Sequence, residues 1–308
     1  MVVAMRCGRR SSLIRTLTLG TLLGACFAFV WQTKAQDPAV DYNTRGVERD
    51  KKGEYDRAIA DFNRAIRLDP NDAVAYSNRG NTWNNEKEYD QAIADCNQAI
   101  RLDPDFVLAY INRSCAWNGK KEYDRAIADC NQAIKLDPDN ALAYNNRGSA
   151  WYDKKEYDRA IADCDQAIKL DPHRALAYYN RGGAWCAKKE YARAVVDCNQ
   201  AIKLDPNYAN TYARLAWLQA TCPDARFRDG HQAFDNASRA CQLNGGKDAE
   251  IVDTLAAACA EKGDFEAARK WQAKAIGLST NEKKKQERRS RLKLYERGRP
   301  YHHELAPR

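Results

Sequence analysis

Asparagine and arginine stand next to each other at one place in the chain, and the pair returns at a fixed interval. It occurs as Asn78-Arg79, Asn112-Arg113, Asn146-Arg147 and Asn180-Arg181, each copy 34 residues after the one before. An arginine can hold a carboxylate through two parallel hydrogen bonds, and an asparagine amide offers a donor and an acceptor to a peptide group. The pair therefore predicts ion pairing and recognition of backbone groups rather than bond-breaking chemistry.

The arginines have a carboxylate partner at a constant distance along the chain, because an aspartate follows each of them 16 residues later. Where the later copies have Leu215 and Leu255 instead of arginine, they have Asn236 and Trp271 instead of aspartate. A charge that is buried without a partner is costly, so we expect each arginine to pair with its aspartate, within one repeat or between neighbours. The expected structural ion pairs are Arg79 with Asp95, Arg113 with Asp129, Arg147 with Asp163, and Arg181 with Asp197, with Arg45 and Asp61 as a fifth pair.

The elements that must position these residues follow from the same period. Tyrosines at 42, 76, 110, 144, 178 and 212 are equally spaced. Within each interval, apolar or small residues fall at helical spacing in two blocks, and Leu-Asp-Pro ends the second block. A period of this length, made of two amphipathic helices, indicates a solenoid.

The second copy carries the pattern most completely, in Tyr76, Gly80, Trp83, Ala92, Cys96, Ala99 and Pro104. This arrangement of aromatic, small and proline positions resembles the tetratricopeptide repeat (TPR) family, in particular its exported bacterial members. The resemblance implies an all-α, right-handed α-solenoid of about seven helix-turn-helix repeats with a C-terminal capping helix. The repeats are expected at 39–72, 73–106, 107–140, 141–174, 175–208, 209–248 and 249–282, within a solenoid that spans 36–282.

The end of the chain departs from the regular pattern. The sixth copy has a longer turn between its helices, from Thr221 to Gly230, and the seventh has Thr280 where the first five have proline. A solenoid must cover its last apolar face, so residues 283–308 are expected to form a basic capping helix and tail.

The first helix of each repeat is expected to present the asparagines to the inner, concave surface. A row of amides at one spacing could hold an extended peptide segment through its backbone. The predicted function is a non-enzymatic protein–protein interaction scaffold whose protein or peptide partner is not identified; alternatively, the asparagines are solvated or bond within their own helix. The expected peptide-binding groove contains Asn78, Asn81, Asn112, Asn145, Asn146, Tyr179 and Asn180.

The basic residues near the C-terminus leave a second function open. Lysines and arginines cluster in 283–291 and could bind anionic lipid, which would make the protein a membrane-associated assembly factor or spacer. The competing interpretation is a solvated capping helix, because Glu282, Glu287 and Glu296 interrupt the cluster. The net charge of +8 comes from the two ends of the chain, so nucleic-acid binding is not expected.

No spacing of catalytic or metal-binding type occurs, so we expect no enzyme activity, no cofactor and no metal. Four cysteines recur at one place in successive repeats, which indicates small core residues. Cysteine chemistry is the remaining, least favoured functional class. The recurring cysteines are Cys96, Cys130, Cys164 and Cys198.

Residues 1–35 have the features of an export segment, because four arginines precede an apolar run from Leu17 to Trp31. A cleaved signal peptide or an N-terminal membrane anchor is expected, and lipidation at Cys26 is a further alternative. Basic residues before the apolar run send the following chain out of the cytoplasm. The expected location is exported: periplasmic, or anchored to the outer face of the bacterial inner membrane.

Overall fold

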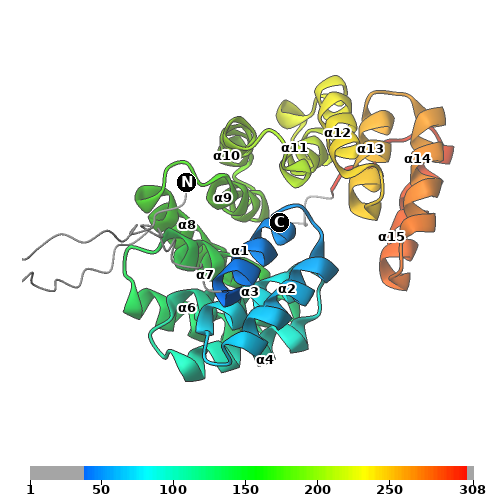
Figure 1. The fold of residues 1–308 in the computed structure, drawn as a ribbon. Helices are drawn as coiled ribbons and strands as arrows, with labels where there is room; N and C mark the ends of the chain where they lie inside the picture. The colour runs from blue at the N-terminus through cyan, green and yellow to red at the C-terminus, as the bar shows by residue number, and fades with distance from the viewer. Residues whose placement is uncertain (1–37, 304–308) are drawn as a thin grey trace, which may run out of the picture. The chain divides into compact units, whose positions relative to one another are not determined.

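The structure, a computed structural model, describes residues 38–303, and every regular element in this range is a helix (Figure 1). Each helix packs mainly on the helices next to it in the chain, so the fold is an all-α solenoid. The fold class expected from the sequence is therefore confirmed.

The helices form seven antiparallel pairs, here called A and B within each pair, followed by one more helix. The pairs are α1 (Pro38–Lys51) with α2 (Tyr55–Leu68), α3 (Ala73–Asn85) with α4 (Tyr89–Leu102), α5 (Val107–Gly119) with α6 (Tyr123–Leu136), α7 (Ala141–Asp153) with α8 (Tyr157–Leu170), α9 (Ala175–Ala187) with α10 (Tyr191–Leu204), α11 (Ala209–Thr221) with α12 (Gly230–Asn244), and α13 (Ala249–Glu261) with α14 (Phe265–Leu278). The last helix is α15 (Glu282–Glu296), and a short 3-10 helix η1 (Ala225–Phe227) lies in the longer turn of the sixth pair.

Small residues let the two helices of a pair approach closely. A Cβ atom on Gly80 would lie 2.9 Å from the Cys96 sulfur and 3.2 Å from the Ala92 carbonyl oxygen. The fourth repeat has the same arrangement, since a Cβ on Gly148 would lie 3.1 Å from the sulfur of Cys164. A larger side chain would push the helices apart, so the glycine and the buried cysteine belong to one packing contact.

The turn between repeats is set by the aspartate of the Leu-Asp-Pro sequence. The carboxylate of Asp69 accepts a hydrogen bond from the backbone N–H of Asn71 at 2.9 Å, and Asp103, Asp137, Asp171 and Asp205 make the equivalent bond. This local bond stabilises a turn, and the proline that follows cannot continue the helix. Each repeat therefore ends at the same place.

The turn inside a repeat needs one residue in the left-handed backbone region. Gly53 and Gly263 occupy this place in the first and seventh repeats, with φ of 75° and 91°. Four of the repeats between them have a lysine there instead, with positive φ at Lys87, Lys121, Lys155 and Lys189. A side chain in this region is strained, so these lysines cost stability that glycine would not.

The A helices line the inner side of the stack. Each A helix of the first five repeats contacts the A helix of the next repeat, whereas neighbouring B helices make at most marginal contact. Helices that touch on one side and separate on the other form a curved stack. The surface of the A helices is therefore the concave one.

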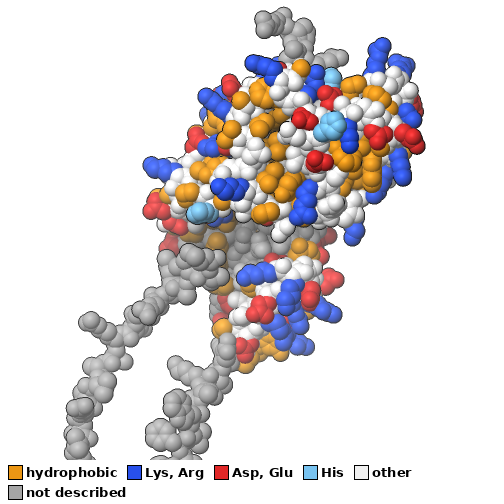
Figure 2. All heavy atoms as spheres, turned by 90° about the horizontal axis from the view of Figure 1, so that it is seen from above, with side chains coloured by type: hydrophobic (Ala, Val, Ile, Leu, Met, Phe, Trp, Pro, Cys, Tyr) orange, Lys and Arg blue, Asp and Glu red, His pale blue; other side chains and the backbone are white. Residues whose placement is uncertain are grey.

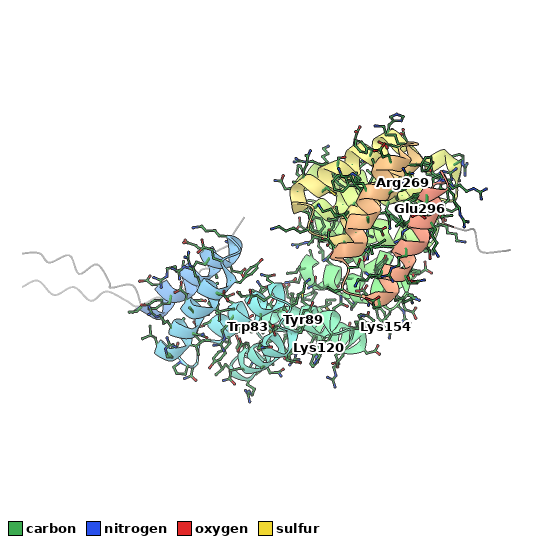
Figure 3. All side chains as sticks on the ribbon, turned by 90° about the vertical axis from the view of Figure 1, so that its right-hand side faces the viewer. Trp83, Tyr89, Lys120, Lys154, Arg269 and Glu296 are labelled. Carbon is green, nitrogen blue, oxygen red and sulfur yellow. The ribbon has the colours of Figure 1, made fainter. Side chains whose placement is uncertain are left out.

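The C-terminal part has a more apolar core than the rest. Ten of the 13 residues of α13 are buried, and this helix packs against α11, α12, α14 and the fully buried Tyr295 of α15. In Figure 3, Arg269 of α14 and Glu296 at the end of α15 lie side by side in this region. The last helix covers the end of the stack, as expected for a cap.

The N-terminal segment predicted to direct export, residues 1–35, lies outside the described residues. Within residues 38–303, no helix combines the length and the apolar character that crossing a membrane requires.

Candidate functional site

The structure brings each predicted arginine and aspartate together. Arg113 of α5 donates through Nε and Nη2 to the two carboxylate oxygens of Asp129 on α6, at 2.8 and 2.6 Å. This two-bond geometry fixes the angle between the helices more strongly than a single bond can. The same bonds join Arg45 to Asp61, Arg79 to Asp95, Arg147 to Asp163, and Arg181 to Asp197.

Each of the later arginines also reaches the repeat before it. Arg113 Nη1 donates to the amide oxygen of Asn97 on α4 at 2.6 Å, and its guanidinium lies 5.5 Å from the ring centre of Tyr110. Asn63, Asn131 and Asp165 accept the equivalent bond in the other repeats. The hydrogen bond to Asp129 raises the pKa of Arg113, so the side chain stays charged. One guanidinium thus ties together three helices: the arginine–aspartate pair lies within one repeat, and a separate hydrogen bond reaches the preceding repeat.

A second series of inter-repeat contacts uses the lysine before the left-handed turn residue. Lys120, Lys154 and Lys188 each pair with an aspartate in the preceding repeat: Asp90, Asp124 and Asp158. In Figure 3, Lys120 and Lys154 follow one another along one edge of the stack. These aspartates are exposed, so each pair contributes little stability.

The asparagines beside the arginines are half-buried and join neighbouring repeats. The amide nitrogen of Asn112 donates to the backbone oxygen and the hydroxyl of Ser77, at 3.2 and 3.0 Å. Asn78 donates to Asn43, Asn146 to the Cys115 sulfur, and Asn180 to Asn145. Each of these four amides therefore uses a donor within the protein.

The other predicted groove residues differ in their surroundings. Asn145 is only 3% exposed, donates to Asn146 and accepts from Asn180, so it supports its neighbours rather than facing open space. The side chain of Asn81 is half-buried and makes no hydrogen bond to a described residue. The free amide of Asn81 is thus available to a ligand in a way that Asn145 is not.

Exposed aliphatic side chains form a row on the same helices. Val40, Val74, Leu108 and Leu176 are 49, 44, 47 and 40% exposed, and each is the second residue of its repeat. The row supplies apolar contact area beside the asparagine amides. Their exposure makes them the most accessible large apolar side chains of the A helices.

The asparagine series ends at the sixth repeat, where Arg214 of α11 takes the equivalent place. Its guanidinium lies over the ring of Tyr179, 3.8 Å from the ring centre, and 5.8 Å from that of Tyr152. Burial alone would lower the pKa of Arg214, but the neighbouring hydroxyls of Tyr179 and Tyr152 raise it above its ordinary value. A Cβ on Gly183 would lie 1.6 Å from Arg214 Nη1, so only glycine leaves room for the guanidinium.

Arg214 lines a cavity of about 1010 Å³ between α9, α11, α13 and the C-terminal segment. Its walls include the aromatic rings of Tyr152, Tyr179, Tyr191, Trp217 and Tyr301. A volume of this size falls at the upper end of the range of ligand pockets. Apart from Tyr179, the cavity shares no residue with the predicted peptide groove.

The last described residues form one wall of this cavity. His303 donates its backbone N–H to the Thr221 carbonyl at 2.9 Å, and Trp217 Nε1 donates to His303 Nε2 at 3.0 Å. His302 contacts a carboxylate oxygen of Glu261 at 2.6 Å. The segment after α15 is therefore held against α11 and α13.

The basic residues of α15 are largely used within the fold. Arg288 is buried and donates to the Ser279 hydroxyl at 2.6 Å, and Arg291 pairs with Asp253 at 2.5 Å. Lys284 pairs with Glu250. The expectation of a solvated helix is therefore corrected. One face of α15 packs on the protein, and Arg288 and Arg291 on that face bond to residues of the preceding helices and turn. Figure 2 shows basic and acidic side chains interspersed over the face that it displays.

The nine cysteines of residues 38–303 are unpaired thiols. The four recurring ones are buried, and burial raises the pKa of Cys130, Cys164 and Cys198 to about 12. A thiol needs a lowered pKa to act as a nucleophile near neutral pH. Among the same residues, no group of histidine, cysteine and carboxylate side chains is arranged to hold a metal ion.

Sequence reasoning missed the surroundings of Arg214. The available signal was the break in the asparagine series, where an arginine follows Asn180 at the next interval of 34 residues. The long turn of the sixth repeat and the capping helix obscured this signal, because the residues that complete the cavity come from distant parts of the sequence.

Comparisons with known proteins agree with this architecture. The family model described as tetratricopeptide repeat matches residues 73–106, 141–174 and 175–208, and the model described as TPR repeat matches residues 51–83 and 120–154. A comparison with curated protein sequences found no match.

Several solved structures share the fold. The Cut9-Hcn1 hetero-tetramer of the APC/C is 21% identical with a TM-score of 0.64, over 73% of this chain and 44% of that one, so this chain spans less than half of that protein. A tetratricopeptide repeat protein from Parabacteroides merdae is 16% identical with a TM-score of 0.54, over 85% of this chain and 100% of its own. TTC0263 from Thermus thermophilus is 20% identical with a TM-score of 0.53, over 57% and 96%. At these identities the likeness concerns the fold.

Proposed function

Because this chain belongs to the tetratricopeptide repeat family, whose members serve as protein–protein interaction scaffolds, we propose that it holds an extended segment of a partner protein. The segment lies along the concave surface of α1, α3, α5, α7 and α9. The observation that carries this proposal is the row of exposed aliphatic side chains, one on the A helix of each of four repeats.

The chemistry of the surface favours an extended, largely uncharged segment. Apolar contacts to residues such as Val74 and Leu108 supply affinity, and the amides of Asn78, Asn81 and Asn112 supply hydrogen bonds to its backbone. The arginines of this surface are already neutralised by their aspartates. The groove therefore offers little free charge to an acidic partner.

The proposed protein is a scaffold and not an enzyme. Its thiols carry raised pKa values, and burial raises even that of Cys186, beside the cavity, to about 11. A thiol titration of the folded chain checks this point, because one abnormally reactive cysteine would contradict it.

The alternative, an assembly factor that binds anionic lipid through its C-terminal residues, has weaker support. Arg288 and Arg291 are committed to contacts with α13, which leaves Lys283, Arg289 and Lys293 as exposed cations of α15. Vesicle co-sedimentation with and without anionic lipid separates the two functions. Binding that requires anionic lipid and survives changes in the groove would favour the alternative.

Export remains part of the proposal, on the strength of the arginines and the apolar run in residues 1–35. The scaffold would then act in the periplasm or at the outer face of the inner membrane. An alkaline phosphatase fusion after the solenoid tests this location, because the reporter is active only outside the cytoplasm. An inactive reporter would contradict export.

The groove is tested by a crosslinking pull-down of the full chain from its own cells. Changing Val74, Leu108 and Leu176 to glutamate places charge on exposed groove positions without touching the bonds between repeats. We expect the partner to be lost while circular dichroism remains helical. The matched control is Val196→Glu, since Val196 is a 66% exposed aliphatic residue on the B helix α10.

A further inference from the structure

The cavity beside Arg214 contains a cation that the fold does not neutralise. Arg214 is half-buried and makes no ion pair with any carboxylate of the described residues. The other described arginine of the cavity wall, Arg291, is paired with Asp253. Holding an arginine out of water without a counter-ion costs free energy. Binding of an anion in the cavity would offset part of that cost.

The way Arg214 is held leaves its hydrogen-bond donors accessible. The central carbon of the guanidinium lies 3.8 Å from the centre of the Tyr179 ring, so the ring packs against the group. A guanidinium carries five N–H donors in one plane, and none of those of Arg214 is taken by a carboxylate of the described residues. Gly183 provides the space for this arrangement, so Tyr179 and Gly183 together form a cradle.

The acidic residues of the wall are engaged elsewhere or exposed. Asp248 caps α13, Glu250 pairs with Lys284, and Asp253 pairs with Arg291. Glu287 is exposed, as is the unpaired Lys189 at the opposite side of the lining. Among the described residues of the lining, Arg214 is therefore a half-buried cation without a carboxylate partner.

The rest of the lining is suited to an aromatic ring. The rings of Tyr152, Trp217 and Tyr301 line the same cavity. The ring centres of Trp217 and Tyr301 lie 6.1 Å apart. A pair of aromatic rings gains more interaction free energy than the burial of its surface alone supplies. These rings and the unpaired arginine together indicate a ligand that has both an anionic group and an aromatic ring.

We propose that this cavity is a binding site for a compact ligand that carries an oxyanion beside an aromatic ring, with Arg214 as the charge receptor and Tyr179 and Gly183 as its cradle. The site goes beyond the proposed scaffold function, because most of its lining comes from repeats five to seven and the C-terminal segment, and because it takes a compact ligand rather than an extended segment. Either site can exist without the other.

Two dyes test the proposal on the full chain. Anilinonaphthalene sulfonate carries an oxyanion on aromatic rings, and N-phenyl naphthylamine has the same rings without the charge. We expect saturable fluorescence enhancement with the sulfonate, and Arg214→Gln should weaken its binding by about tenfold or more, because a charge-assisted hydrogen bond is lost. Binding of the neutral dye should change by less than about twofold in the same variant.

Two further variants make the test specific to the cradle. Gly183→Ala keeps every charge but displaces the guanidinium, so it should weaken binding of the sulfonate dye about as much as Arg214→Gln does. Arg193→Gln is the matched control, because Arg193 also stacks on an aromatic ring, 4.6 Å from the centre of Trp185, but is exposed outside the cavity. It should bind both dyes like the unchanged chain.

The proposal is overturned if the sulfonate does not bind saturably, or if its affinity is the same in Arg214→Gln as in the unchanged chain. It is also overturned if both dyes lose affinity equally, which would indicate an apolar patch only. Thermal melting of each variant accompanies the titrations. If Arg214→Gln does not fold, Gly183→Ala and Arg214→Lys decide the outcome, since the lysine keeps the charge but loses the planar donor set and should bind with intermediate affinity.

Discussion

In the first five repeats the helices are joined by arginine–aspartate pairs, whereas the equivalent places in the last two repeats hold Leu215, Leu255 and Trp271. The polar pairs fix the angle between helices and reach back to the previous repeat. The apolar core around α13 is continuous and is closed by Tyr295. The first five repeats thus copy one unit and leave their inner face open. The last two repeats form a continuous apolar core that α15 closes.

The difference has a functional counterpart. Repetition gives the first region a row of equivalent surface positions, which suits an extended partner. The second region departs from the repeat and gathers residues from several helices around Arg214, which suits a compact ligand. The following predictions start with the largest expected effect.

Removing the cap should damage the C-terminal region and spare the first repeats. Tyr295→Ala deletes a fully buried aromatic side chain, and such changes cost about 3–5 kcal/mol. Because each repeat of a solenoid depends chiefly on its neighbours, hydrogen exchange should accelerate in α13 and α14 and remain slow in α5 and α6. Uniform acceleration along the chain would show that the two regions unfold as one unit.

Breaking one polar pair should be most harmful when only one partner is removed. Asp129→Ala leaves Arg113 without its carboxylate, and the expected loss of unfolding free energy is about 2–4 kcal/mol. The double change of Arg113→Leu with Asp129→Asn imitates the sixth repeat and should recover most of this loss. Urea denaturation of the three chains measures the difference. If the double variant is as unstable as the single one, the pair does not act as a unit.

The asparagine bonds between repeats should contribute less. Asn112→Ala removes two hydrogen bonds to Ser77, and we expect a loss of about 1 kcal/mol in the unfolding free energy. Asn81→Ala is the control, because Asn81 makes no bond to a described residue and should change stability by less than about 0.5 kcal/mol. Equal losses would indicate that the bonds to Ser77 add nothing.

The lysines in the left-handed turn offer a stabilising change. Lys121 has a φ of 64°, and Lys121→Gly should raise the unfolding free energy by up to about 1 kcal/mol by relieving the strain. Thermal melting measures the gain. The neighbouring Lys120→Gly should instead lose the contact with Asp90, so a gain in both variants would contradict the explanation.

Acid should weaken the first pair within a defined range. Hydrogen bonding to Arg45 lowers the pKa of Asp61 in the folded chain. The stabilisation is therefore fully present above the unfolded pKa of about 3.9, and it is lost as the pH falls through the lower folded value. Urea denaturation from about pH 5 down to about pH 2 should show a shallower decline of the unfolding free energy in Asp61→Asn than in the unchanged chain. Parallel declines would contradict the assigned pair.

The sequence predicted the regular repeats well because their signals are local and repeated. The Leu-Asp-Pro turns, the small residues such as Gly80 and the matched charges of Arg113 and Asp129 recur at one spacing, so each copy supports the interpretation of the others. The capping helix was expected within 283–308 and spans Glu282–Glu296.

The surface was predicted less well, because sequence spacing gives the face of a helix but not the partner of a side chain. Asn145 was expected in the groove and is buried by Asn146 and Asn180. The arginines of α15 were expected in solvent, but Arg288 is buried against Ser279. The cavity at Arg214 depends on contacts between residues far apart in the sequence, for which the 34-residue period carries no information.

The most direct test of the central claim, that the open inner face of the first repeats holds a partner segment, is site-specific photocrosslinking in living cells. A photoreactive phenylalanine analogue replaces Leu108 on the inner face in one chain and Val196 on the B helix α10 in another. The account predicts that Leu108 crosslinks to one defined segment of a partner protein and that Val196 does not. Crosslinks to the same segment from Val196, with none from Leu108, would contradict the claim.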